Sequence, residues 1–142
     1  MLRYAPVALA LAIAGTAAPA FAQDSEFVGI AMFGEYVPQG EGEEDALGDF
    51  DGEFDMAGGQ ICYYLDLDGV TGATGLAIHS GERGENGPMV ARLRLPADPL
   101  EEECVAVEAD VQRAILADRE GHYMVVTAPM RDNGAIRGQL ID

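Results

Sequence analysis

The feature that most constrains the fold is a pair of neighbouring segments in which apolar and acidic residues alternate. Residues 49–56 read DFDGEFDM, and residues 61–68 read ICYYLDLD. A period of two puts one kind of residue on each face of an extended strand, whereas a helix repeats every 3.6 residues. The two segments are therefore predicted to be strands with one apolar face directed toward a core.

The glycines at residues 58–59 lie between these segments and suit a two-residue hairpin turn, which needs positive φ angles. A turn at this position pairs Ala57 with Gln60 and places Phe54 opposite Tyr63. All the apolar residues of the hairpin then share one face. A slip of one residue would turn them toward solvent, so the sequence specifies the register strongly.

The outer face of the predicted hairpin is acidic. The same register sets Asp51 opposite Asp66, and Asp49 opposite Asp68, and like charges directly opposite each other are destabilising. Two compensations are open. Arginines from a neighbouring strand, Arg92 and Arg94, could neutralise the aspartates, or the four carboxylates could bind a hard cation such as calcium, which prefers clustered oxygen ligands.

Short alternating segments continue along the chain, separated by glycine, proline and Asp/Asn clusters. We expect further strands at residues 26–34, 74–80, 89–95, 104–109, 122–127 and 135–141, and a short helix at residues 110–117. Residues 35–47 and 81–88 are predicted loops, and a tight turn is predicted around residues 132–134. About eight short strands and one short helix predict an all-β fold, an antiparallel Greek-key (immunoglobulin-like) β-sandwich.

The beginning of the chain predicts export. A single cation, Arg3, precedes an apolar run at residues 7–14, and Ala20 and Ala22 form a small-x-small cleavage site before Gln23. The apolar run is too short to span a bilayer, which needs about 20 residues. We therefore expect a signal peptide at residues 1–22 and one domain at residues 23–142, secreted or periplasmic, without a transmembrane segment after cleavage.

Charge limits the partners of this domain. The formal net charge is −17, and every cation is an arginine. Such a chain is not expected to bind nucleic acid through phosphates, and anionic membrane surfaces should repel it. Cations or cationic partners are the electrostatically sensible ligands, unless the charge serves only to keep an exported protein soluble.

The two cysteines, Cys62 and Cys104, predict one disulfide bond, because an exported domain with an even cysteine count usually oxidises them. Both lie on the polar side of their predicted strands, so the bond is expected outside the core. The two histidines, His79 and His122, lie far apart in the sequence, and with two thiols they are too few for a convincing metal site.

Three stretches together resemble the CHRD domain, the module repeated in chordin and found singly in exported bacterial proteins. Residues 75–90 (GLAIHSGERGENGPMV) resemble the family's histidine segment and its glycine-proline continuation, and residues 121–127 (GHYMVVT) resemble a second motif. Residues 134–140 (GAIRGQL) match the family's Gly-x-Ile-Arg-Gly-Gln-Leu ending in full. The family-motif residues are His79, Gly81, Gly87, Pro88, Tyr123, Ile136, Arg137, Gly138 and Gln139.

Departures from the family pattern bear on function. Ala77 and Thr127 replace two of the family's histidines, so the resemblance implies that any metal-binding histidine cluster has been lost, and His79 is interpreted as a hydrogen-bonded structural residue. Arg137 lies among small and apolar residues, and a buried guanidinium must be paired with a carboxylate or carbonyl groups. We interpret Arg137 as a fold-stabilising ion pair rather than a ligand-binding residue.

The sequence shows no catalytic constellation: neither serine lies in a motif with a base, and no carboxylate spacing singles out an acid–base pair. The resemblance implies an exported binding or interaction module of unknown ligand, with no cofactor unless calcium binds the aspartates. Its partner is expected to be an extracytoplasmic protein or an envelope component. The alternatives are a metal-binding protein or metalloenzyme with the architecture of superoxide dismutase, and a purely structural envelope protein.

Overall fold

The structure is a computed structural model that describes residue 15 and residues 24–142. Apart from residue 15, the predicted signal peptide at residues 1–22 lies outside the described residues. The described chain contains eight strands: β1 (Ser25–Phe33), β2 (Leu47–Asp55), β3 (Gln60–Asp68), β4 (Gly75–Ser80), β5 (Met89–Leu93), β6 (Glu103–Ala106), β7 (His122–Ala128) and β8 (Arg131–Gln139). It also contains the helix α1 (Ala109–Ala117) and the short 3₁₀ helices η1 (Gly34–Tyr36), η2 (Pro38–Gly40) and η3 (Arg119–Gly121).

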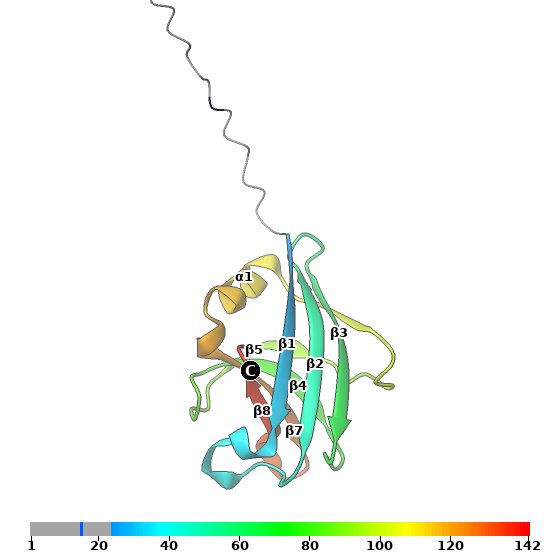
Figure 1. Cartoon of the computed structure of the whole chain (residues 1–142), viewed down its shortest axis with the longest axis vertical. Coiled ribbons are helices and arrows are strands. Elements are labelled where there is room, and N and C mark those ends of the chain that lie inside the picture. The colour runs from blue at the N-terminus through cyan, green and yellow to red at the C-terminus, as the bar shows by residue number, and fades with distance from the viewer. Residues whose placement is uncertain (1–14, 16–23) are drawn as a thin grey trace, which may run out of the picture.

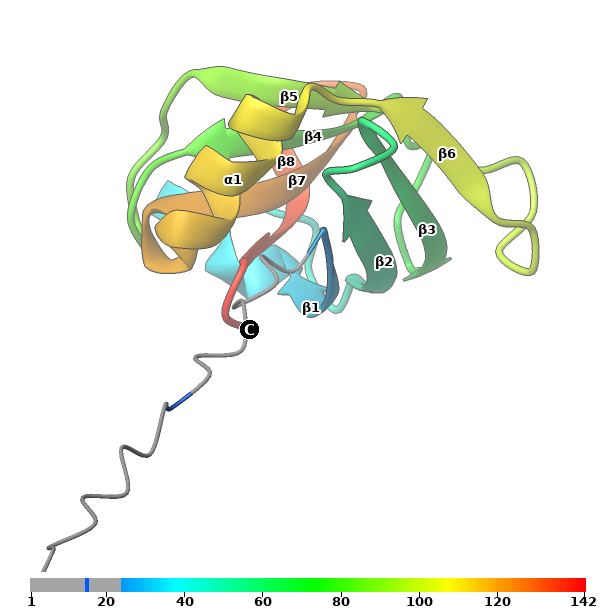
Figure 2. The ribbon, with the colours of Figure 1, turned by 90° about the horizontal axis from the view of Figure 1, so that it is seen from above.

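The strands form one antiparallel sheet in the order β5-β4-β7-β8-β1-β2-β3-β6. Strands β8 and β1 are paired only at Arg137 and Phe33, so the sheet bends there into two four-stranded halves. Figures 1 and 2 show the bent sheet curving around into a nearly closed, barrel-like shape, with β4, β5, β7 and β8 across from β1, β2 and β3. The predicted all-β, antiparallel class is confirmed. The sheet is continuous rather than divided into two separate sheets, and the Greek-key, immunoglobulin-like detail stays a prediction.

The core lies between the two halves. It is formed by fully buried apolar side chains from both of them, including Met32, Phe50, Phe54, Ile61, Tyr63, Leu76, Ile78, Met124, Val126 and Ile136. Helix α1 adds the buried Ile115, and Gln112 on the same helix donates a hydrogen bond of 2.8 Å to the carbonyl of Val107. Period-two alternation along the strands supplies this core, as the sequence predicted.

The register of the β2–β3 hairpin differs from the predicted register by two residues. Asp55 pairs with Gln60 and Phe54 with Ile61, and residues 56–59 form a four-residue turn. The Asp55 side chain stabilises this wider turn, because its Oδ1 accepts a hydrogen bond of 2.7 Å from the backbone N–H of Gly58. A shift by two residues keeps every side chain on its predicted face, so the core is unaffected.

The last hairpin also turns earlier than predicted. Its turn lies at Pro129 and Met130, and residues 132–134 belong to β8. Pro129 fixes the φ angle that a turn needs at its second position, and Met130 adopts a positive φ of 63°. The Asn133 side chain instead donates to a carboxylate oxygen of Glu41 at 2.8 Å.

The two halves of the sheet have different outer faces. The outer face of β4, β7 and β8, hereafter the covered face, carries the buried side chains of Ala77, Tyr123, Val125, Arg137 and Gln139. Two segments lie over it: residues 81–88, and residues 34–46, where the Glu43 N–H donates to the carbonyl of Ala135 at 2.7 Å. The outer face of β1, β2, β3 and β6, hereafter the bare face, leaves Phe27 77% exposed and Tyr64 45% exposed.

Candidate functional site

Most of the family-motif residues come together on the covered face, either within residues 81–88 or beneath them, and form what is hereafter called the motif cluster. Strand β7 lies between β4 and β8, and Tyr123 on β7 is paired with His79 on one side and Gln139 on the other. The Tyr123 ring stacks on the His79 ring with a centroid distance of 5.2 Å. The Arg137 guanidinium carbon lies 3.4 Å from the centroid of the same Tyr123 ring. The three motifs therefore build one polar cluster from three adjacent strands.

Arg137 is the centre of this cluster and is 1% exposed. Its guanidinium donates hydrogen bonds to the carbonyls of Glu85 at 2.6 Å and Glu82 at 2.8 Å, and to Oε1 of Gln139 at 3.1 Å. Burial lowers the pKa of Arg137 below its usual value, because it penalises the charged form, while Tyr123 and Glu85 favour the charge. The predicted ion pair is therefore wrong: carbonyl groups and an aromatic ring, not a carboxylate, satisfy this cation.

His79 and Gly87 fix the C-terminal end of residues 81–88, hereafter the covering segment. The His79 Nδ1 lies 2.8 Å from the carbonyl oxygen of Gly87, and the Gly87 N–H donates to the Tyr123 hydroxyl at 3.0 Å. A Cβ atom at Gly87 would lie 1.6 Å from the carbonyl oxygen of Ser80, so only glycine fits there. The carbonyl of Pro88 accepts the Ser80 N–H at 2.9 Å and closes the loop. These contacts agree with the interpretation of His79 as a structural residue.

The remaining motif residues hold the sheet itself. Gly81 lies against the Tyr123 ring and donates its N–H to the carbonyl of Gly121 at 2.8 Å. Ile136 is fully buried in the core. A Cβ at Gly138 would lie 2.3 Å from the carbonyl oxygen of Ala31, so this glycine lets β8 cross close to β1. The motif residues thus attach residues 81–88 to the sheet and let β8 lie close to β1. The protein itself supplies hydrogen-bond partners for the side chains of Arg137, Gln139 and Tyr123 and for Nδ1 of His79.

The four predicted aspartates on the bare face are brought together only in part. Asp49 does lie opposite Asp66, but Asp51 faces Tyr64, and Asp68 faces Leu47. The two-residue register shift is the reason for the difference. The predicted compensation by Arg94 is also not found, because its side chain donates to Glu103 and to the carbonyl of Cys104 instead. Arg92 lies on β5, in the other half of the sheet.

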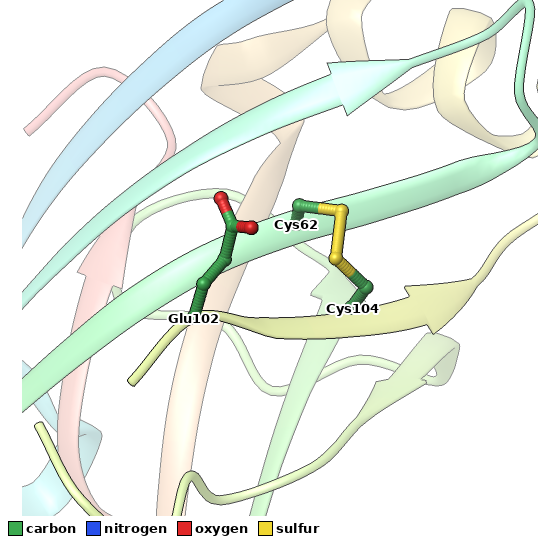
Figure 3. Close-up of side chains that lie close together, drawn as sticks. All are labelled: Cys62, Glu102 and Cys104. Atoms are coloured by element: carbon green, nitrogen blue, oxygen red, sulfur yellow. A yellow bond between two sulfur atoms is a disulfide. The ribbon is translucent and has the colours of Figure 1, made fainter. Parts of the chain in front are cut away.

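The disulfide bond joins Cys62 on β3 directly to its cross-strand neighbour Cys104 on the edge strand β6. The predicted pairing and its position outside the core are both found in the structure. Figure 3 shows the bond linking the two strands, with the Glu102 side chain beside it. In residue 15 and residues 24–142, Cys62, Glu102 and Cys104 form a cluster of side chains whose possible metal-ligand atoms all lie within 4.8 Å of one another. The sulfur atoms already form the disulfide, so we do not assign a metal to the grouping.

A shallow hollow of about 240 Å³ lies on the bare face beside this bond. It is lined by residues of β1, β2 and β3 and by one residue beside β6, among them Phe27, Gly29, Asp51, Glu53, Cys62, Tyr64 and Glu102. No motif in the sequence marks Phe27, Glu53, Tyr64 or Glu102 as binding residues. The available signal was parity, since Phe27 alternates with the inward-facing Val28 and therefore has to face outward.

The two histidines do not converge. They lie on the adjacent strands β4 and β7, but His79 is paired with Tyr123, and His122 precedes Tyr123 in β7 and so points to the opposite face. Each has its Nδ1 close to a backbone carbonyl oxygen, at 2.8 Å from Gly87 for His79 and at 2.7 Å from Asp118 for His122.

Comparison with known protein families agrees with this architecture. The model of the CHRD domain matches residues 30–140, which is nearly the whole described chain. This protein belongs to the CHRD domain family. Membership supports a binding or interaction role in general terms. No significant match is found among curated proteins or among solved structures. In the part of the CHRD protein that the structure describes, neither α1 nor a 3₁₀ helix has the length and apolarity to cross a membrane.

Proposed function

We propose that this CHRD protein is an exported binding module that holds another exported protein against its bare face, and that it does not catalyse a reaction. The observation that carries the proposal is the difference between the two outer faces. On the covered face, the polar groups of the motif cluster bond to one another and to residues 81–88. On the bare face, aromatic and acidic side chains of β1, β2 and β3 are open to solvent.

The exposed aromatics support a binding role for that face. Phe27 and Tyr64 are large aromatic residues that point away from the core, so packing of the core does not explain why aromatic residues stand at these positions. Aromatic side chains are enriched in protein interfaces, because they supply much contact area at a low cost in conformational entropy. Charge supports a cationic protein over an anionic surface, since the chain has a net charge of −17.

The proposal includes an extracytoplasmic location for the protein. The expected leader at residues 1–22 and the single disulfide bond both favour an oxidising, extracytoplasmic environment. Expression of the full chain in a bacterial host, followed by fractionation and mass determination, tests this expectation. The product should be secreted or periplasmic, should begin at Gln23 and should contain no free thiol. An uncleaved cytoplasmic product with two thiols would overturn the localisation.

Capture from an extracytoplasmic extract tests the binding face. Immobilised mature domain should retain at least one protein that the double variant Phe27→Ala, Tyr64→Ala does not retain. The matched control is Leu100→Ala, Met130→Ala, which truncates two side chains that are 86% and 99% exposed but lie outside the bare face. The partner is then purified and its binding is measured directly. If each captured protein binds all three forms equally, the bare face is not the binding surface.

A further inference from the structure

The side chains around the hollow on the bare face restrict the kind of chemical group that can bind there. Strand pairing places Phe27 opposite Glu53 and Gly29 opposite Asp51, which in turn faces Tyr64 on β3. Gly29 has no side chain, so the taller residues around it enclose a depression of about 240 Å³. A Cβ atom at Gly29 would meet only the Asp51 carboxylate, at 3.2 Å, so the space above this glycine is otherwise open.

The carboxylates around the hollow lack cationic partners. None of the ion pairs among residues 24–142 includes Asp51, Glu53 or Glu102. The nearby Arg94 is already bonded to Glu103 and to the carbonyl of Cys104. The hollow therefore combines two aromatic side chains with three carboxylates that the described chain does not neutralise. A cation with a flat, weakly hydrated surface suits both kinds of group, because it stacks on the rings and donates to the carboxylates.

We propose that the hollow binds an arginine side chain presented by a basic segment of the partner protein. This inference rests on the proposed binding function and names the chemistry of its partner. A guanidinium is planar, stacks on aromatic faces and donates to carboxylates in a fork, which an ammonium group cannot do. The volume suits one long side chain rather than a drug-sized ligand, whose pockets are roughly 300–1,000 Å³.

The test uses the mature domain and two synthetic probes. One is a fluorescein-labelled peptide of alternating arginine and serine, and the other carries citrulline, the neutral isostere, at each arginine. Binding is followed by fluorescence anisotropy at about 0.15 M ionic strength, where attraction beyond ~8 Å is screened. The arginine peptide should bind, and the affinity of the citrulline peptide should be lower by at least about tenfold, because cation–π and charge-assisted contacts are lost.

Variants separate the hollow from the general negative charge. Gly29→Val fills the hollow, leaves every charge in place and suits a strand, and it should weaken binding of the arginine peptide about tenfold. Asp51→Asn with Glu53→Gln should weaken binding similarly. The matched pair Asp66→Asn with Asp68→Asn removes the same charge from the same face outside the hollow, and it should change the affinity by no more than about twofold.

Two outcomes would overturn the inference: equal weakening by both charge pairs, which indicates nonspecific attraction, and equal binding of the arginine and citrulline peptides. Melting temperatures within about 2 °C of the wild type show that the variants fold. If Gly29→Val does not fold, Tyr64→Ala tests the same contact from the rim. Capture of a partner that depends on Phe27 and Tyr64 but not on Gly29, Asp51 or Glu53 would retain the proposed function and reject the arginine site.

Discussion

The two outer faces of this sheet differ in how their charged side chains are stabilised. On the covered face, a buried arginine is acceptable because carbonyls of residues 81–88, Gln139 and the Tyr123 ring surround it. On the bare face, water solvates the carboxylates and so reduces the repulsion between Asp49 and the opposing Asp66. The residues that look functional in the sequence thus maintain the architecture, while ordinary-looking surface residues remain available to a ligand.

Removing the disulfide bond is expected to have the largest effect, and it acts on the bare face. The bond closes a loop with a sequence separation of 42 and attaches the edge strand β6 to β3. The variant Cys62→Ala, Cys104→Ala should lose about 2–4 kcal/mol of unfolding free energy, mainly because the unfolded chain gains freedom. Urea unfolding measures the loss. Reductant should lower the stability of the wild type by a similar amount and leave that of the variant unchanged. A loss of less than about 1 kcal/mol of unfolding free energy in the variant would contradict this account.

The covered face is expected to depend on Arg137 to a similar but smaller extent. Arg137→Met leaves the carbonyls of Glu82 and Glu85 without their donor, and we expect a loss of about 3 kcal/mol of unfolding free energy. Hydrogen exchange should also become faster at the amide of Gly87, which bonds to Tyr123. Lysine cannot reproduce the fork of donors, so Arg137→Lys should recover little of the loss.

Arg113 provides the control for this prediction. It is an exposed arginine on α1 with one ion pair to Asp110, and Arg113→Met should change the stability by less than about 0.5 kcal/mol. If Arg137→Met proves as mild as Arg113→Met, the motif cluster does not hold the covering segment in place.

Tyr63 connects the two halves and gives a smaller, pH-dependent effect. Its hydroxyl donates to the carbonyl of Arg94 at 2.5 Å and accepts the Arg94 N–H at 2.8 Å. Burial raises the pKa of Tyr63 above its usual value near 10. A group whose pKa is raised by folding stabilises the fold fully below its unfolded pKa, and this stabilisation is lost as pH rises through the folded pKa. Alkaline solution above pH ~10 should therefore weaken the contact between the halves.

The variant Tyr63→Phe isolates this effect. It should lose about 1 kcal/mol at neutral pH, because the two hydrogen bonds to Arg94 are lost, and its stability should fall less steeply than that of the wild type above pH ~10. Urea midpoints at neutral and alkaline pH measure both quantities. Tyr64→Phe, on the exposed neighbouring residue, is the matched control and should alter neither. Parallel pH profiles for Tyr63→Phe and the wild type would exclude a role of the Tyr63 hydroxyl in alkaline unfolding.

The sequence was sufficient for those features that depend on parity. Alternation predicted which side chains of β2 and β3 face the core, and it placed Cys62 and Cys104 outside the core. Parity does not distinguish two registers that differ by two residues. The choice between them depended on the Asp55 side chain, which stabilises a four-residue turn. The four aspartates were therefore assigned to the correct face but to the wrong opposing pairs.

The motif cluster was beyond prediction for a different reason. The need of Arg137 for partners could be inferred from its apolar surroundings, but its main acceptors are backbone carbonyls of Glu82 and Glu85, which carry no sequence signal. The hollow on the bare face was missed because it is formed where a glycine, Gly29, lies beside taller residues on other strands. Such a shape requires the cross-strand register, which alternation alone leaves open.

The smallest predicted effect compares one residue type on the two faces. Tyr64→Ala on the bare face should change the unfolding free energy by less than about 0.5 kcal/mol, because the ring is 45% exposed and packs outside the core. Tyr123→Ala on the covered face should cost about 3 kcal/mol, because it removes a buried ring between His79 and Arg137. Urea unfolding of both variants gives the difference directly. A large loss for Tyr64→Ala would mean that its ring stabilises the sheet, and its exposure would then no longer argue for a role in binding.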